Sequence, residues 1–209
     1  MRTTDALDGL ECLDCGEPFD PTAETGRCPD CGGILDPTYD YDAVDLSFDS
    51  GAVGSMWRYD DVLPFPADAA VTLAEGGTPL VPAPELAESW DVGEVWIKDE
   101  GRNPTGTFKD RGQSVAVTAA REHGADDVAL ASAGNAGQAA SAYAAAAGLD
   151  AHVFLPERAG FTQKAMVEVH GGDLSVADPL KGDSQIGDAG AALERALEAH
   201  DWHPVQTFV

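Results

Sequence analysis

From near residue 94 onward, short apolar runs alternate with longer helical patterns, and this alternation restricts the possible folds. The pattern predicts helices between successive strands, with strands at 95–98, 127–131, 151–155, 173–176 and from 204, and helices at 110–123, 135–147, 162–170 and 185–200. This alternation favours an open parallel sheet with flanking helices, joined by right-handed crossovers. Because the sequence stops at a predicted strand, we expect residues 94–209 to be part of a larger α/β domain.

Charge is the most extreme property of the composition. Asp and Glu total 37 residues against 12 Lys and Arg, which gives a formal net charge of −25. A surface of this sign repels a phosphate backbone, so nucleic acid is not an expected partner. The acidic residues are scattered between patterned apolar segments, which indicates a folded chain with an acidic surface. Such a surface resembles that of proteins from salt-accumulating halophiles, and an ordinary acidic protein is the alternative.

The sequence also bears on the cellular compartment. No apolar stretch approaches the roughly 18 residues that a membrane span requires, so a membrane partner is not expected. The first residues show neither a secretory signal nor an Arg-rich transit peptide. The expected compartment is the cytoplasm, and the charge suggests a cytoplasm of high salt.

Residues 1–50 contain all four cysteines as two Cys-x2-Cys pairs, at Cys12, Cys15, Cys28 and Cys31. Two such pairs, separated by twelve residues, are typical of a zinc ribbon, because each pair turns two thiolates toward one tetrahedral ion. Two disulfides are the competing interpretation. Four thiolates leave no open position for substrate, so the expected Zn²⁺ is structural. Residues 51–93 form an irregular connector arm with a short helix near 85–90.

A lysine follows the predicted strand at 95–98. Lys109 lies in the loop sequence NPTGTFKDRG, at the start of the helix predicted from Asp110. Open α/β sheets place ligands at such strand-to-helix loops, and a lysine near an apolar side chain such as Phe108 can lose its proton and become nucleophilic. The alternative is a helix-start lysine paired with Asp110.

A second strand-to-helix loop has the sequence ASAGNAG, from Ala131 to Gly137. Its small residues allow backbone N–H groups to approach an anion at the helix terminus, and the amide of Asn135 can donate and accept hydrogen bonds. An Asn135 helix cap beside packed glycines is the structural alternative. If the two loops open successive helices on neighbouring crossovers, Lys109 and Asn135 face one crevice.

These motifs together resemble those of a known family. The sequence EGGTPL at 75–80, then KDEG at 98–101 running into NPTGTFKDRG, then SAGNAGQAASAYAAAAG, is similar to the amino-terminal half of fold-type II pyridoxal-phosphate enzymes. Within that family the residues flanking Lys109 resemble those of threonine synthases. The resemblance covers residues 73–209, and the cysteine-rich segment resembles amino-terminal extensions of some threonine synthases.

The resemblance implies a role for each loop. Lys109 would hold pyridoxal phosphate through its amine and then act as acid and base, with Phe108 packed beside the cofactor. Asn135 would hydrogen-bond the 3-oxygen of the cofactor. The substrate carboxylate would be received by the loop residues Ser132, Ala133, Gly134 and Ala136. The implied reaction is a lyase reaction that converts O-phosphohomoserine and water to threonine and phosphate.

The resemblance also leaves gaps. Arg111 and Lys164 are candidates for substrate phosphate contact, although ion-pair or solvated roles are the ordinary alternatives. Family members have a later glycine-rich loop for the cofactor phosphate, whereas Gly187 and Gly190 fall in a predicted helix. We therefore expect a partial enzyme, inactive alone, that requires a completing C-terminal segment or forms a homo-oligomer. The alternatives are a serine/threonine dehydratase-like enzyme and a non-catalytic remnant whose zinc ribbon mediates protein contacts.

Overall fold

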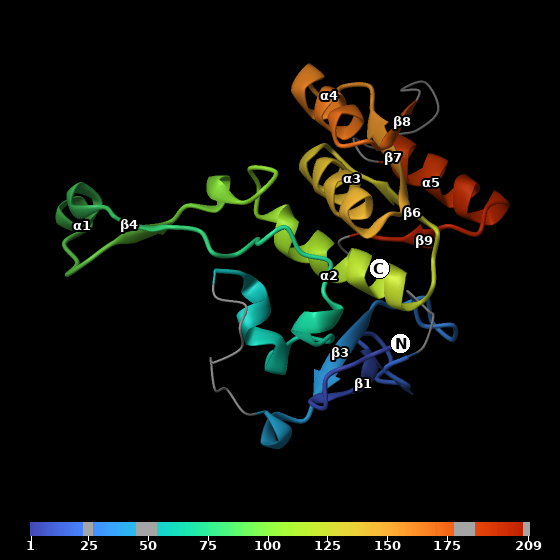
Figure 1. Cartoon of the computed structure of the whole chain (residues 1–209), viewed down its shortest axis with the longest axis horizontal. Coiled ribbons are helices and arrows are strands. Elements are labelled where there is room, and N and C mark those ends of the chain that lie inside the picture. Colours follow the sequence, from blue (N-terminus) through green and yellow to red (C-terminus); the bar gives the residue numbers. More distant parts are fainter. Residues whose placement is uncertain (23–26, 45–53, 178–186, 207–209) are drawn as a thin grey trace.

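The computed structural model describes residues 1–22, 27–44, 54–177 and 187–206, and it divides into three parts (Figure 1). A small cysteine-containing sheet lies at the N-terminal end. A connector of short 3-10 helices leads from it into a two-stranded arm. The α/β unit follows, and the C-terminal end of the described chain runs along one edge of its sheet.

The α/β unit contains a four-stranded parallel sheet in the order β8-β7-β6-β9. Its strands are β6 (Asp127–Ala131), β7 (Asp150–Pro156), β8 (Asp173–Ala177) and β9 (His203–Pro204). The register aligns Val128 of β6 with Ala151 of β7, and Val153 of β7 with Leu174 of β8. Branched side chains such as Val128 and Val153 are fully buried in the core. The prediction of an α/β fold with a parallel sheet is confirmed.

Four helices accompany this sheet: α2 (Lys109–Glu122), α3 (Asn135–Ala147), α4 (Phe161–Val169) and α5 (Gly187–Ala199). Helices α3 and α5 lie on opposite sides of the sheet (Figure 1). Helix α3 approaches β7 closely because Gly137 has no side chain; a Cβ atom there would lie 2.6 Å from Cγ1 of Val153. Alanines then fill the rest of this narrow interface. The first two residues predicted for the last helix, and residues 207 and 208 of the predicted last strand, lie outside the described residues.

One predicted strand is not part of the parallel sheet. Strand β5 (Trp96–Lys98) pairs antiparallel with β4 (Leu80–Pro82), and the short helix α1 (Pro84–Trp90) connects them. The three elements form an arm that projects from the rest of the molecule (Figure 1). The place beside β6 is taken by β9, and the N–H of Val205, the residue after β9, donates to the carbonyl oxygen of Ala129 at 3.0 Å. The expectation that 95–98 precedes a crossover in the same sheet is therefore wrong.

The connector packs against α2. Its 3-10 helices Met56–Val62 and Ala67–Ala69 contribute a small core of Met56, Trp57, Phe65 and Ala69, which contacts Val115 and Ala119 of α2. A third 3-10 helix, Glu100–Arg102, follows β5. Apolar burial on one side of α2 thus fixes the connector in place.

The N-terminal part is a three-stranded antiparallel sheet in the order β2-β1-β3. The strands are β1 (Leu7–Cys12), β2 (Pro18–Phe19) and β3 (Leu35–Tyr39), followed by the 3-10 helix Tyr41–Ala43. The Thr4 N–H donates to the carbonyl oxygen of Pro64 at 3.1 Å, and Arg2 pairs with Glu122 of α2 at 2.9 Å. These contacts attach the N-terminal sheet to the connector and to α2. Within the parts of the chain that the structure describes, no helix is long and apolar enough to cross a membrane.

Candidate functional site

The four cysteines come together beside the N-terminal sheet. The sulfurs of Cys12 and Cys31 lie 3.5 Å apart, those of Cys15 and Cys28 lie 3.7 Å apart, and all four lie within 4.8 Å of one another. A tetrahedral zinc ion with Zn–S bonds of about 2.3 Å separates its sulfurs by about 3.8 Å. A disulfide instead requires about 2.05 Å, and all four thiols are free. The cluster therefore has the dimensions of a four-thiolate metal site.

Local backbone geometry supports this cluster. Each Cys-x2-Cys pair is followed by a glycine with positive φ, +74° at Gly16 and +76° at Gly32, a conformation that glycine adopts without strain. Their N–H groups donate to the carbonyl oxygens of Cys12 and Cys28, which closes each turn. The backbone N–H of Cys15 lowers the pKa of the Cys12 thiol to about 7. Although the Gly33 N–H lowers the pKa of Cys31, the neighbouring Cys12 and Cys15 thiols outweigh it and raise that pKa. Within the cluster, Cys12 is therefore the thiol favoured as thiolate, the form that binds a metal.

Lys109 is the first residue of α2 and is half-buried. Its Nζ lies 4.9 Å from the centre of the Phe108 ring, and that ring is 56% exposed. Asp110 turns away from the lysine: its carboxylate is fully buried and accepts a hydrogen bond from the Thr105 N–H at 2.8 Å. Burial raises the pKa of Asp110. The alternative of a Lys109–Asp110 pair is therefore not observed among the described residues, and the amine is available at the mouth of α2.

The loop before α3 is shaped by Ser132. Its buried Oγ accepts hydrogen bonds from the N–H groups of Gly134 at 3.0 Å and Gly137 at 3.1 Å. Gly134 has a φ of +147° and stands at the cap position, so Asn135 is the first helical residue and not the cap. The Asn135 side chain is exposed. Ser132 thus already satisfies two N–H groups at the start of α3, and Asn135 and Ala136 are the positions there whose N–H groups can face an anion.

Hydrogen bonds through Gln138 and Thr105 join the two loops, and neither residue was predicted as a site residue. The Gln138 side-chain amide, one turn into α3, donates to the carbonyl oxygen of Thr105 in the lysine loop. Thr105 is in turn held by Asp110, and all three residues are at least nine-tenths buried. The Lys109 loop and the start of α3 therefore form one hydrogen-bonded unit. In the sequence, the one signal for this link is Gln138, a polar residue one turn after the loop in a helix that is otherwise rich in alanine.

A second buried network lies deeper. The fully buried carboxylate of Glu75 accepts hydrogen bonds from Trp57 Nε1 at 2.8 Å, Ser114 Oγ at 2.8 Å and Tyr143 Oη at 2.7 Å. Burial is the main cause that raises the pKa of Tyr143, and its hydrogen bond to the Glu75 carboxylate raises the pKa further. Ser114 belongs to α2 and Tyr143 to α3, so Glu75 connects the helices that carry the two loops.

The two cations considered for substrate phosphate already have partners. Arg111 makes two hydrogen bonds of 2.8 Å to the carboxylate of Glu100. The Arg111 guanidinium lowers the pKa of Glu100 to about 2. Lys164 Nζ donates to the carbonyl oxygen of Glu157 at 2.6 Å. These contacts fit the ordinary structural roles that were the alternatives for both residues.

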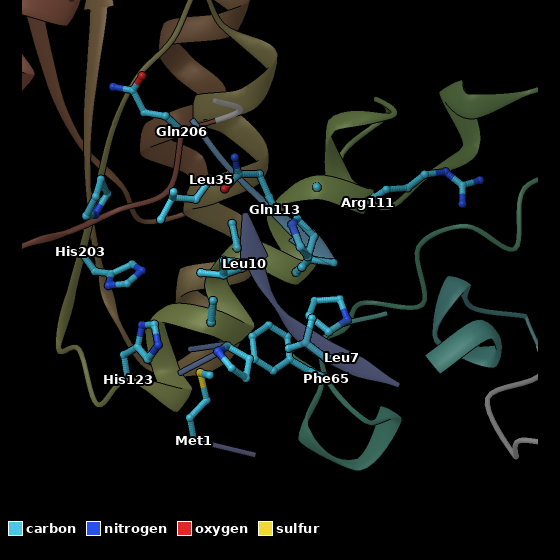
Figure 2. Close-up of a pocket in the computed structure, with 18 of the residues that line it drawn as sticks. Met1, Leu7, Leu10, Leu35, Phe65, Arg111, Gln113, His123, His203 and Gln206 are labelled. Atoms are coloured by element: carbon cyan, nitrogen blue, oxygen red, sulfur yellow. The ribbon is translucent and has the colours of Figure 1, made fainter. Parts of the chain in front are cut away.

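Lys109 also lines a cavity of about 620 Å³ between α2 and the N-terminal sheet (Figure 2). Phe108 and Gln113 of α2, Leu10 and Leu35 of the sheet and Gln206 after β9 are among its other lining residues. Arg111 points away from the cavity, toward the connector (Figure 2). The loop of Ser132, Ala133, Gly134 and Ala136 is not part of the lining. The cavity therefore extends from Lys109 in a different direction from the cradle at α3.

Comparisons with known proteins agree with this arrangement. Residues 71–209 match the family model described as "Pyridoxal-phosphate dependent enzyme". The chain is 38% identical over 149 residues to threonine synthase of Methanosarcina acetivorans, which covers 70% of this chain and 36% of that protein. It is 39% identical over 152 residues to threonine synthase of Methanocaldococcus jannaschii, covering 70% and 37%.

Among solved structures, maize serine racemase is similar with a TM-score of 0.54 and 23% identity, over 62% of this chain and 38% of that chain. This likeness concerns the fold. The curated relatives above are matched over little more than a third of their own length. The family model covers well over half of the chain and includes both loops, so the chain belongs to the family of pyridoxal-phosphate dependent enzymes.

Proposed function

We propose that this chain is the amino-terminal part of a threonine synthase-like lyase, which converts O-phosphohomoserine and water to threonine and phosphate. The observation that carries the proposal is the 38–39% identity to two archaeal threonine synthases over 70% of the chain. The placement of a half-buried Lys109 beside an open helix start supports it further.

The residues at the starts of α2 and α3 fit one side of pyridoxal phosphate. Lys109 offers an amine at the mouth of α2, Phe108 offers an exposed ring beside it, and Asn135 offers an amide at the start of α3. Bound there, pyridoxal phosphate supplies an electron sink for carbanion chemistry. Lys109 would hold the cofactor and then move protons at its Nζ, and Asn135 would hydrogen-bond the 3-oxygen. The loop Ser132, Ala133, Gly134 and Ala136 would receive the substrate carboxylate, with the N–H groups of Ala133 and Ala136 as donors. The N–H groups of Ser132 and Gly134 already donate to Phe154 O and to Ser132 Oγ.

A completing C-terminal segment is part of the proposal. Gly187 and Gly190 lie in α5, so they do not form a loop for the cofactor phosphate. The arm also exposes apolar side chains on both of its faces, with Val81 44% and Trp96 49% exposed. A two-stranded ribbon of this kind is only marginally stable in water, and it gains stability when another surface covers it. A homo-oligomer would be another way to cover the arm.

Structural zinc is the metal we propose for the cysteine cluster, because four thiolates at tetrahedral spacing suit that ion. The acidic composition supports a haloarchaeal-like protein of a high-salt cytoplasm. The segment 1–50 would be the zinc ribbon, 51–93 the connector arm and 94–209 the partial catalytic domain.

The test of function is a product assay on the chain combined with a separately expressed C-terminal segment of a threonine synthase, with pyridoxal phosphate present. Release of inorganic phosphate from O-phosphohomoserine, lost in the Lys109→Ala variant, is the expected result. Release of ammonia from serine or threonine would instead support the dehydratase alternative. Zinc retention with neither product, in a complex shown to form, would support the non-catalytic remnant.

A further inference from the structure

The cavity beside α2 has two ends, and only one of them is near the proposed cofactor. Lys109 is the first residue of α2 and His123 follows its last, so they are separated by about 21 Å along the helix. Figure 2 shows His123 beside His203 and near Met1; the two rings have centroids 5.3 Å apart. The His123 end is thus a separate place where a second ligand can lie.

Among the described residues, the cavity is lined by many apolar side chains and by several polar or cationic ones such as Lys109, but by no acidic one. Leu7, Leu10 and Leu35 come from the N-terminal sheet, Phe65 from the connector and Ala119 from α2. None of the residues that line the cavity is Asp or Glu, although the chain contains 37 of them. In a strongly acidic molecule, an acid-free apolar cleft with histidines is the place where an anion meets the least repulsion.

Two of the residues that line the cavity carry buried polar atoms without partners. Among the described residues, neither ring nitrogen of His123 has a hydrogen-bond partner, and the same holds for Oε1 of Gln113. Gln113 is 3% exposed, and its Nε2 donates to the carbonyl oxygen of Val205 at 3.0 Å, which directs the oxygen elsewhere. Buried polar groups in folded proteins are nearly always paired with protein, water or a ligand. Both residues line the cavity, so an occupant can supply the missing partners.

We propose that the His123 end of this cavity binds a small monocarboxylate with an apolar body. The ring N–H of His123 donates to the carboxylate, while Leu7, Phe65 and Ala119 contact the apolar body. A volume of about 620 Å³ lies within the range of small-molecule sites. Gln113 Oε1 lies farther along α2, where it accepts a hydrogen bond from water or from a hydroxyl or amino group on a longer ligand. A cation of the same shape lacks a carboxylate partner in these walls.

Three probes with one apolar body and different head groups test the charge preference: octanoate, octanol and octylammonium. Calorimetric titration of the full chain in 2 M KCl, where long-range repulsion is screened, gives their affinities. We expect saturable binding of one octanoate per chain, at least tenfold tighter than octanol, and no saturable binding of octylammonium. Octylammonium binding as tight as octanoate would overturn the proposal, as would the absence of saturable octanoate binding.

Variants locate the site. His123→Leu keeps an apolar side chain of similar size, so it should weaken octanoate at least tenfold and leave octanol unchanged, a result that a folding defect cannot mimic. Ala119→Phe fills the cavity and should weaken both probes. His200→Leu, at an exposed histidine outside the lining, is the matched control and should change neither. Unchanged octanoate affinity in His123→Leu would refute the assignment.

A competition experiment separates this site from the proposed cofactor site. Octanoate affinity measured with excess pyridoxal phosphate should stay within threefold of its value without it. Stoichiometric displacement of octanoate by pyridoxal phosphate would show that the cavity belongs to the cofactor, and would overturn the proposal while supporting the proposed function.

Discussion

At the scale of single residues, two buried carboxylates position the helices that carry the candidate site. Glu75 accepts hydrogen bonds from Ser114 of α2 and Tyr143 of α3, and Asp110 holds the lysine loop through Thr105. A buried carboxylate is costly unless several donors satisfy it, and each of these has at least two. Among the described residues, Lys109 pairs with neither carboxylate, so its amine is available for chemistry.

A single ion pair gives a pH prediction at this scale. Glu100, whose side chain is 26% exposed, pairs with Arg111, and its pKa falls from 4.5 to about 2. Because the folded-state pKa is depressed, the stabilisation is full above about pH 4.5 and is lost as pH falls toward 2. We expect Glu100→Gln to lower the free energy of unfolding by about 1 kcal/mol at pH 6 and by nothing near pH 2. Urea titrations at both pH values measure it, with the exposed Glu88→Gln as control. A pH-independent difference would contradict the assignment.

At the scale of elements, the sequence identifies segments better than it identifies their neighbours. Residues 127–131 and 135–147 have the predicted bounds because their apolar period and flanking glycines are local signals. The run at 95–98 is a strand, but its pairing with Leu80–Pro82 depends on distant residues that periodicity does not encode. Cysteine spacing predicted the cluster because four thiolates must converge. The Glu75 network and the cavity could not be predicted, since both join four or more segments that are remote in sequence.

Two glycines in helices give a matched pair of predictions. Gly137 of α3 lies where a Cβ would come within 2.6 Å of Val153, whereas a Cβ on Gly190 of α5 would meet no atom within 4 Å. Gly137→Ala should therefore lower the free energy of unfolding by about 1–3 kcal/mol through overpacking. Gly190→Ala should raise it by about 0.5–1 kcal/mol through helix propensity. Chemical denaturation measures both, and equal effects of the two substitutions would mean that α3 does not pack on β7 as closely as described.

At the scale of the whole molecule, the acidic charge and the exposed apolar arm are the dominant features. A formal charge of −25 on 209 residues opposes compaction in dilute buffer, because charge repulsion extends over long distances there and is screened only at high salt. The arm exposes apolar side chains that another surface would cover. The charge and the arm together describe a chain whose stability depends on its surroundings.

Salt should therefore stabilise the fold. Between 0.1 and 2 M KCl we expect Tm to rise by about 10 °C, equivalent to roughly 3 kcal/mol for a chain of this size. Thermal unfolding followed by circular dichroism measures the change, with sucrose at matched viscosity as the control for non-ionic effects. A Tm that is insensitive to KCl would argue for an ordinary acidic protein.

The proposed role of Lys109 in a cofactor half-site is tested by titrating the chain with pyridoxal phosphate in molar KCl. We expect a weak, saturable visible absorbance band in the native chain that is lost in Lys109→Ala. Lys98→Ala, at a lysine on the arm, serves as the control for reaction with surface amines and should retain the band. A band of equal size in the Lys109→Ala protein, or no band in a chain shown to be folded, would contradict the claim.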